Sequence, residues 1–186
     1  MAAMARGLPV YSASQDGGKV VIVCDPDREG DVLEEMTSLL EKGLVSRDRT
    51  GRFAMLQTIL DFAREHLDAS DEAARFRALH ADHYRVFAER LEHGLEAGDH
   101  AQLQWMQRGI RADGNLDAAL AWFRTEAAKG DADAVEAGLR TCGALMLYWH
   151  IRAQHVRMQE AVDGFLEHRV DPEPTVGWAM AMNARS

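Results

Sequence analysis

The chain has 186 residues, a length that fits one domain or two small ones with room for a hydrophobic core. Hydrophobic residues make up 47% and charged residues 27%, a balance typical of globular proteins that excludes disordered and collagen-like classes. Thirty acidic residues against 21 basic ones give a formal net charge of −9, which disfavours bulk binding to nucleic acid.

No apolar run approaches the roughly 18 positions of a membrane span, and the first residues lack the apolar core of a signal peptide. We therefore expect a cytoplasmic protein with no membrane partner. Its two cysteines, Cys24 and Cys142, lie far apart and outside any CxxC pair, so we expect buried thiols rather than a disulfide framework or a zinc site.

The first third of the chain predicts a small mixed module. Residues 1–14 carry no period and are expected to be irregular, and the β-branched run at 19–24 predicts a short strand. From Asp31 the apolar spacing predicts a helix that ends at Gly43, in the position of a left-handed cap. Two short segments, at 44–48 and 52–56, then flank a glycine-containing turn and predict a hairpin.

A further amphipathic helix follows the hairpin and reaches Leu67. The order helix, hairpin, helix is typical of a winged helix, so we assign residues 15–69 to a winged-helix-like module. The polar segment that follows, Asp68-Ala69-Ser70-Asp71, is the predicted domain boundary.

Residues 71–170 are helical in pattern, with apolar positions at alternating steps of three and four. We predict five helices here: the second has Leu103, Met106 and Ile110 as its apolar stripe, and the fourth begins at Asp131. Asp113-Gly114-Asn115 is interpreted as a break that separates the second from the third. Consecutive helix–turn–helix units of this size favour an antiparallel, tetratricopeptide-like (TPR-like) array. Residues 171–186 are predicted to be a truncated C-terminal segment. The predicted fold class is therefore mainly α: a small winged-helix-like module followed by this array.

The sharpest chemical motif is the apolar run at 21–24 followed by the residues DPDREGD. It resembles the acidic motif of the Toprim domain of type IA topoisomerases, a resemblance that implies Mg²⁺ binding by Asp25 and Asp27, with Glu29 beside them. A Toprim fold also requires an earlier strand with a catalytic glutamate, and no glutamate precedes Glu29. An acidic turn before a helix N-terminus is the favoured interpretation, and the magnesium enzyme is kept as an alternative.

Other enzyme signatures do not occur. The sequence has no phosphate-binding loop, no HExxH and no G-x-S-x-G, and its histidines show no ligand spacing beyond His80 and His83, one helical turn apart around Asp82. Histidines on a helix are more often packing residues than ligands. We therefore predict a protein without enzymatic activity and without a cofactor.

Two residue sets are candidates for binding partners. Four cations within eleven positions, on and near the predicted hairpin, are candidates for nucleic-acid contact or for a solvated edge that discourages strand pairing. Aromatic residues of the helical array are candidates for an interaction surface, although at least two of the four tryptophans are expected to be buried. The basic set is Lys42, Arg47, Arg49 and Arg52, and the aromatic set is Trp105, Trp122, Tyr148 and Trp149.

Several segments resemble one family. Residues 31–45 and 51–67 resemble the winged helix that follows the ATPase core of STAND-class signalling ATPases, the large LuxR-type and AfsR-type bacterial transcriptional regulators. Residues 77–84, 115–122 and 143–149 resemble the helical repeats that come next in that family. The resemblance covers about residues 31–168 and implies architecture more than activity.

The sequence also departs from this family. Ala153 and Gln154 stand where the family has glycines, and the ATPase module and the DNA-binding helix-turn-helix of the family have no counterpart here. We therefore expect a fragment or a stand-alone remnant of such a regulator.

The sequence thus predicts a non-enzymatic module that binds a protein partner within a STAND-type regulator. A DNA-binding winged helix is a second alternative beside the Toprim-like enzyme. Self-association through uncapped ends of the helical array is a further expectation.

Overall fold

The computed structural model describes residues 15–16, 19–20, 32–47, 53–169 and 175–185. These ranges contain seven helices, labelled α2 to α8, and two short hairpins, so the prediction of a mainly α fold is confirmed. The chain divides into two compact units, Met1–His80 (unit 1) and Ala81–Ser186 (unit 2). The division falls within the long helix α4 (Ala73–Glu96), three turns after the polar segment at 68–71.

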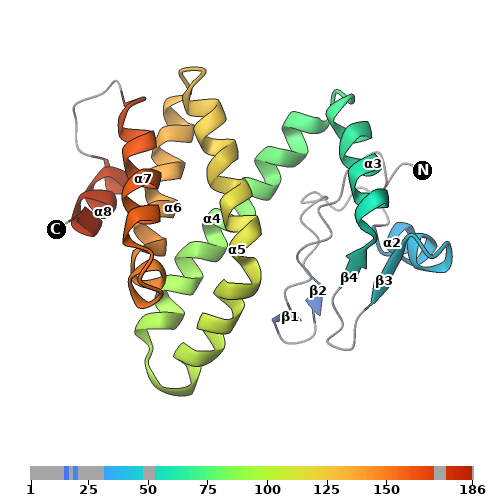
Figure 1. Cartoon of the computed structure of the whole chain (residues 1–186), viewed down its shortest axis with the longest axis horizontal. Coiled ribbons are helices and arrows are strands. Elements are labelled where there is room, and N and C mark those ends of the chain that lie inside the picture. The colour runs from blue at the N-terminus through green and yellow to red at the C-terminus, as the bar shows by residue number, and fades with distance from the viewer. Residues whose placement is uncertain (1–14, 17–18, 21–31, 48–52, 170–174, 186) are drawn as a thin grey trace. The chain divides into compact units, whose positions relative to one another are not determined.

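Unit 1 contains the predicted order of helix, hairpin and helix. Helix α2 (Val32–Glu41) is followed by strands β3 (Val45–Arg47) and β4 (Phe53–Met55), which pair antiparallel, and then by α3 (Gln57–Asp68) (Figure 1). The strand expected at 19–24 appears as β2 (Lys19–Val20), paired with β1 (Gln15–Asp16). Its other residues lie outside the described ranges.

Helix α2 ends as its sequence predicts. Gly43 has a φ of +66°, the left-handed region that glycine adopts without a steric penalty. The Gly43 N–H donates to the Leu40 carbonyl and the Leu44 N–H donates to the Leu39 carbonyl, each over 3.0 Å. This pair of bonds is the Schellman motif, and it directs the chain into β3, where Val45 packs on Met36 and Leu39.

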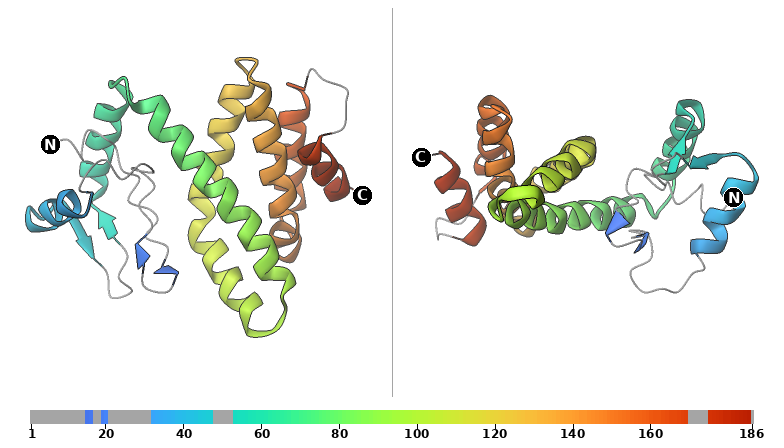
Figure 2. Two further views of the ribbon diagram at one scale, coloured as in Figure 1. Left: turned by 180° about the vertical axis from the view of Figure 1, so that it is seen from behind. Right: turned by 90° about the horizontal axis from the view of Figure 1, so that it is seen from below.

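Unit 2 is built around a central helix. Helix α6 (Ala132–Ile151) packs against α5 (Asp99–Ala127), α7 (His155–Leu166) and α8 (Val176–Arg185). Helices α5, α6 and α7 are joined by short turns and alternate in direction, and α8 lies at the outer edge (Figure 2). The second half of α4 belongs to the same core, where Leu91 packs with residues of α5 and α6.

The helices of unit 2 approach closely at glycines. A Cβ atom at Gly94 would lie 2.1 Å from the Trp105 ring, and one at Gly109 would lie 2.6 Å from the ring of Tyr148. Because only glycine fits at these two positions, the Trp105 ring of α5 lies against the backbone of α4, and the Tyr148 ring of α6 lies against the backbone of α5. The largest side chains that are fully buried in unit 2 are Trp149, Tyr84, Tyr148, Phe165, Leu91, Leu95, Leu116, Leu139 and Leu145.

The predicted break at Asp113-Gly114-Asn115 is wrong. Helix α5 continues through these residues without interruption, so four helices instead of five cover the segment up to Leu166. The reason is tertiary: Asp113 is held by Arg152 and by other groups of the neighbouring helices, and Asn115 is buried. Such contacts outweigh the weak helix propensity of the three residues.

None of the helices that the structure describes combines the length and the apolar character that a membrane crossing requires.

Candidate functional site

The acidic motif lies outside the described residues. Asp25, Asp27 and Glu29 fall within 21–31, and the cations Arg49 and Arg52 fall within 48–52, two ranges that the structure does not describe. Among the residues that it does describe, no group of three or more His, Cys, Asp or Glu side chains is arranged to hold a metal ion.

Two members of the basic set are described, and both are exposed in unit 1. Lys42 follows α2, and its Nζ donates to Ser38 Oγ over 2.8 Å. Arg47 ends β3, and its guanidinium carbon lies 5.8 Å from the centre of the Phe53 ring on the paired strand. Both cations therefore lie at the surface. Lys42 contacts α2, and Arg47 contacts β4.

The predicted aromatic surface is wrong for two of its four residues. Tyr148 and Trp149 are 0% exposed, because α6 is surrounded by other helices and these rings fill the space between them. Trp105 and Trp122 are half-buried, beside Arg108 and Lys129 respectively. Of the four tryptophans, Trp149 is fully buried, and Trp105, Trp122 and Trp178 are half-buried against the core.

A polar cluster joins three helices of unit 2, and we call it the Asp113 cluster. Its centre is Asp113 of α5, which accepts from Arg152 Nη1 at 2.6 Å, from Arg157 Nη1 at 3.2 Å and from Tyr148 Oη at 3.3 Å. Arg152 also donates to Tyr148 Oη over 2.6 Å, and Arg157 pairs with Asp117 one turn further along α5.

The protonation of the Asp113 cluster follows from these contacts. Burial, with Asp113 nearby, raises the pKa of Tyr148 to about 12, which keeps its phenol neutral. The hydrogen bond to Asp113 raises the pKa of Arg152. Two arginines thus face two aspartates, and the charges compensate. We interpret the cluster as a clamp that fixes the end of α6 and the start of α7 against the middle of α5.

The second notable feature of unit 2 is an uncharged surface along α5. Leu103 is 65% exposed and Ile110 is 50% exposed, and seven residues, about two helical turns, separate them on one face. Core residues such as Leu116 and Phe123 occupy the opposite face. We call the exposed strip the α5 outer face. It consists of Leu103, Gln107, Ile110, Gly114, Ala118 and Ala121, which are exposed and uncharged, and the exposed Asp117, seven residues after Ile110, borders it.

The α5 outer face was not predicted from the sequence, because the expected break at 113–115 divided α5 into two short helices. Leu103 and Ile110 then served as the core stripe of a short helix. When residues 99–127 are read as one helix, the larger apolar set, which includes Leu116, Leu120 and Phe123, defines the core side. Leu103 and Ile110 fall on the other side. The uninterrupted apolar period on both sides of Gly114 was the signal that could have revealed this.

Comparison with known protein families, curated proteins and solved structures finds no match to this chain.

Proposed function

We propose that the chain is a protein-interaction module and that it binds its partner through the α5 outer face. The observation that carries this proposal is the exposure of Leu103 and Ile110 on the side of α5 that faces away from the core. Burying one such side chain contributes about 1.5–3 kcal/mol. Two of them in an uncharged strip, framed by polar residues, have the character of the centre of a protein interface.

The structure of the strip also favours a helical or sheet-like partner surface. Gly114, Ala118 and Ala121 are small and exposed, so another backbone can approach α5 closely along its C-terminal half, while Leu103 and Ile110 project from its N-terminal half. Because the strip lies on one continuous helix, its side chains need little ordering before they bind.

A regulatory setting is part of the proposal. It is supported by the resemblance of residues 31–168 to the winged helix and helical repeats of STAND-class transcriptional regulators. The described order of helix, hairpin and helix, followed by packed antiparallel helices, agrees with that resemblance. In such a setting the array presents a contact surface and the smaller module connects it to the rest of a regulator.

The experiment begins with capture of the partner. A photoreactive amino acid at Gln107, on the α5 outer face, is used to crosslink the full chain in cells, with the same group at Gln159 of α7 as the reference position. Both positions are exposed. The crosslinked protein is then identified, purified and tested for direct binding. If it is a second copy of this chain, the contact is a homo-oligomer interface.

The binding test uses two variants of equal charge. Leu103→Asp/Ile110→Asp is expected to weaken binding at least about tenfold, since two apolar contacts are replaced by carboxylates. Gln104→Asp/Gln159→Asp adds the same charge at exposed positions outside the α5 outer face and should bind as the wild type does. Both should unfold within about 0.5 kcal/mol of the wild type. Unchanged binding by the first variant contradicts the proposal.

A further inference from the structure

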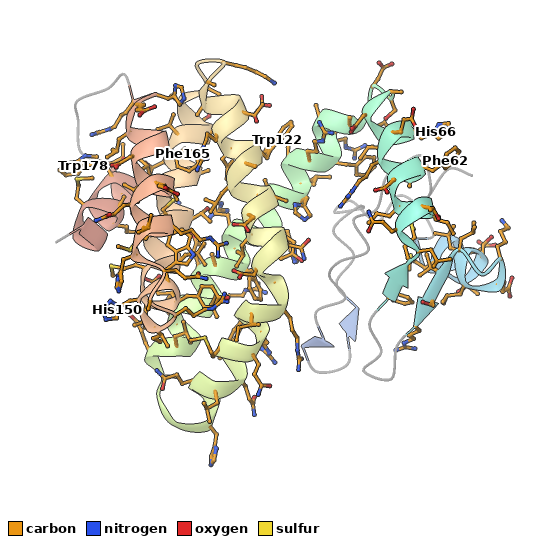
Figure 3. The ribbon with its side chains drawn as sticks, in the orientation of Figure 1. Phe62, His66, Trp122, His150, Phe165 and Trp178 are labelled. Carbon is orange, nitrogen blue, oxygen red and sulfur yellow. The ribbon has the colours of Figure 1, made fainter. Side chains whose placement is uncertain are left out.

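Two histidine rings lie beside each other at the turn between α6 and α7. His150 is in the last turn of α6 and His155 is the first residue of α7, and their ring centres are 5.2 Å apart. Both side chains are exposed, and Figure 3 shows His150 pointing away from the helices. Among the described residues, neither imidazole has a hydrogen-bond, ion-pair or ring partner other than the second imidazole. Their ring nitrogens are therefore accessible to a ligand.

The separation of the rings fits two imidazoles bound to one metal ion. Zinc–nitrogen bonds are about 2.0–2.1 Å long, so the centre of a bound imidazole lies about 3.2 Å from the metal. Two such rings at a tetrahedral angle have centres about 5.2 Å apart. The planes of His150 and His155 meet at 74°, and rotation about the last side-chain torsion, which is soft, adjusts where their nitrogens point.

The backbone that carries the two histidines is held in place. Arg152 and Arg157, each two residues after one of the histidines, both bind Asp113, with Nη1 to carboxylate distances of 2.6 and 3.2 Å. The turn itself is closed by the Gln154 N–H, which donates to the Trp149 carbonyl over 2.8 Å. A site fixed in this way loses little conformational freedom when it binds a ligand.

We propose that His150 and His155 form a binding site for a divalent transition-metal ion of the zinc and copper class. Neutral imidazole is a preferred ligand of these ions. Because no third His, Cys, Asp or Glu joins the pair among the described residues, the ion keeps open coordination positions, which water or an outside ligand takes. This site is separate from the α5 outer face, and its test does not depend on the proposed function.

The test is a calorimetric titration of the full chain with zinc chloride. We expect one saturable site, and we expect His150→Ala and His155→Ala each to weaken binding at least about tenfold, because each removes one of two ligands. Cobalt(II) bound to the wild type should show the absorption of a tetrahedral ion. His100→Ala, which removes an exposed histidine of α5, is the matched control and should bind zinc as the wild type does.

A second measurement uses the wild type alone, so it does not depend on how a variant folds. Zinc should shift the imidazole NMR signals of His150 and His155 and leave those of the other six of the eight histidines in place. The proposal is overturned if either single variant binds zinc as tightly as the wild type. It is also overturned if His100→Ala weakens binding equally, which would show adventitious binding only.

Discussion

At the scale of single residues, Ala153 shows a conflict between side chain and backbone. Its φ is +55°, the one positive value among the described residues that are not glycine, and the Ala153 N–H donates to the His150 carbonyl as the C′ residue of a Schellman motif. Glycine tolerates this conformation, whereas the Cβ of alanine is crowded in it. The motif forms because the Asp113 cluster and the helices on both sides fix the turn.

We therefore expect Ala153→Gly to stabilise the protein by about 0.5–1 kcal/mol, despite the greater freedom of glycine in the unfolded chain. The measurement is the midpoint of urea unfolding, with far-UV circular dichroism as the probe. Ala128→Gly is the matched control, because Ala128 caps α5 with an ordinary φ of −65° and is also exposed. It should destabilise the protein. Destabilisation by Ala153→Gly would contradict the left-handed conformation.

The ionisation of Tyr148 should make the free energy of unfolding of unit 2 fall at alkaline pH. Its pKa is about 12 in the folded protein, and a tyrosine in an unfolded chain has a pKa of about 10. Because the folded pKa is the higher one, the stabilisation is fully present below pH 10 and is lost as the pH rises towards 12. The free energy of unfolding should fall above pH 10 with a slope of up to about 1.4 kcal/mol per pH unit from this group.

Tyr148→Phe should lack this part of the pH dependence, since phenylalanine does not ionise. Urea unfolding of the wild type and the variant at pH 9, 10 and 11 measures the difference. On alkaline titration, the wild type should show a component of tyrosinate absorption near pH 12 that the variant lacks. Equal slopes in both proteins would show that the environment of Tyr148 does not disfavour the phenolate.

At the scale of secondary structure, the sequence predicted the elements whose ends carry local signals. Gly43 marks the end of α2, and Asp131 caps α6 by accepting from the N–H groups of Asp133 and Ala134. The hairpin followed from the glycine-containing turn between two short segments, at 44–48 and 52–56. Such signals act over a few residues, so a single sequence contains them.

The predicted break in α5 was wrong because tertiary contacts, and not local signals, determine the structure of residues 113–115. Asp113, Gly114 and Asn115 have weak helix propensity, and the contacts of Asp113 with Arg152 and Arg157, about 40 positions later, help to hold them in a helix. The predicted aromatic surface was wrong at Tyr148 and Trp149 for the same reason. Whether Tyr148 or Ile110 lies at the surface depends on which side of each helix its neighbours cover, and the local pattern does not contain that information.

Two glycines of α5 test whether this helix is continuous. Gly114 is exposed, and a Cβ atom there would meet no other atom within 4 Å. In a continuous helix, Gly114→Ala should therefore stabilise the protein by about 0.4–1 kcal/mol. Gly109→Ala is the contrasting variant. Its Cβ would lie 2.6 Å from the Tyr148 ring, so this substitution should destabilise the protein by about 1–3 kcal/mol. Thermal unfolding compares them, and a loss of stability in Gly114→Ala would favour a break.

At the scale of the whole molecule, the two units differ in the size of their cores. Among the described residues, the α2–hairpin cluster of unit 1 has three buried members, Met36, Leu39 and Val45, and α3 and the start of α4 add Leu60, Ala63, Leu67 and Phe76, whereas a single large cluster extends over all five helices of unit 2. All four tryptophans of the chain lie at or beyond position 105 and thus report on unit 2 alone. Circular dichroism reports on the helices of both units.

Because buried apolar area sets most of the stability, we expect unit 1 to unfold at lower urea concentration than unit 2. The transition seen by circular dichroism should then begin before the one seen by tryptophan fluorescence. Two matched variants assign the phases: Leu39→Ala, at a residue that is 3% exposed, should lower the early phase alone, and Leu145→Ala, at one that is 0% exposed, should lower the fluorescence midpoint. Each should cost about 2–5 kcal/mol in its own unit. Superimposable curves, both shifted by Leu39→Ala, would instead mean that α4 couples the units into one cooperative structure.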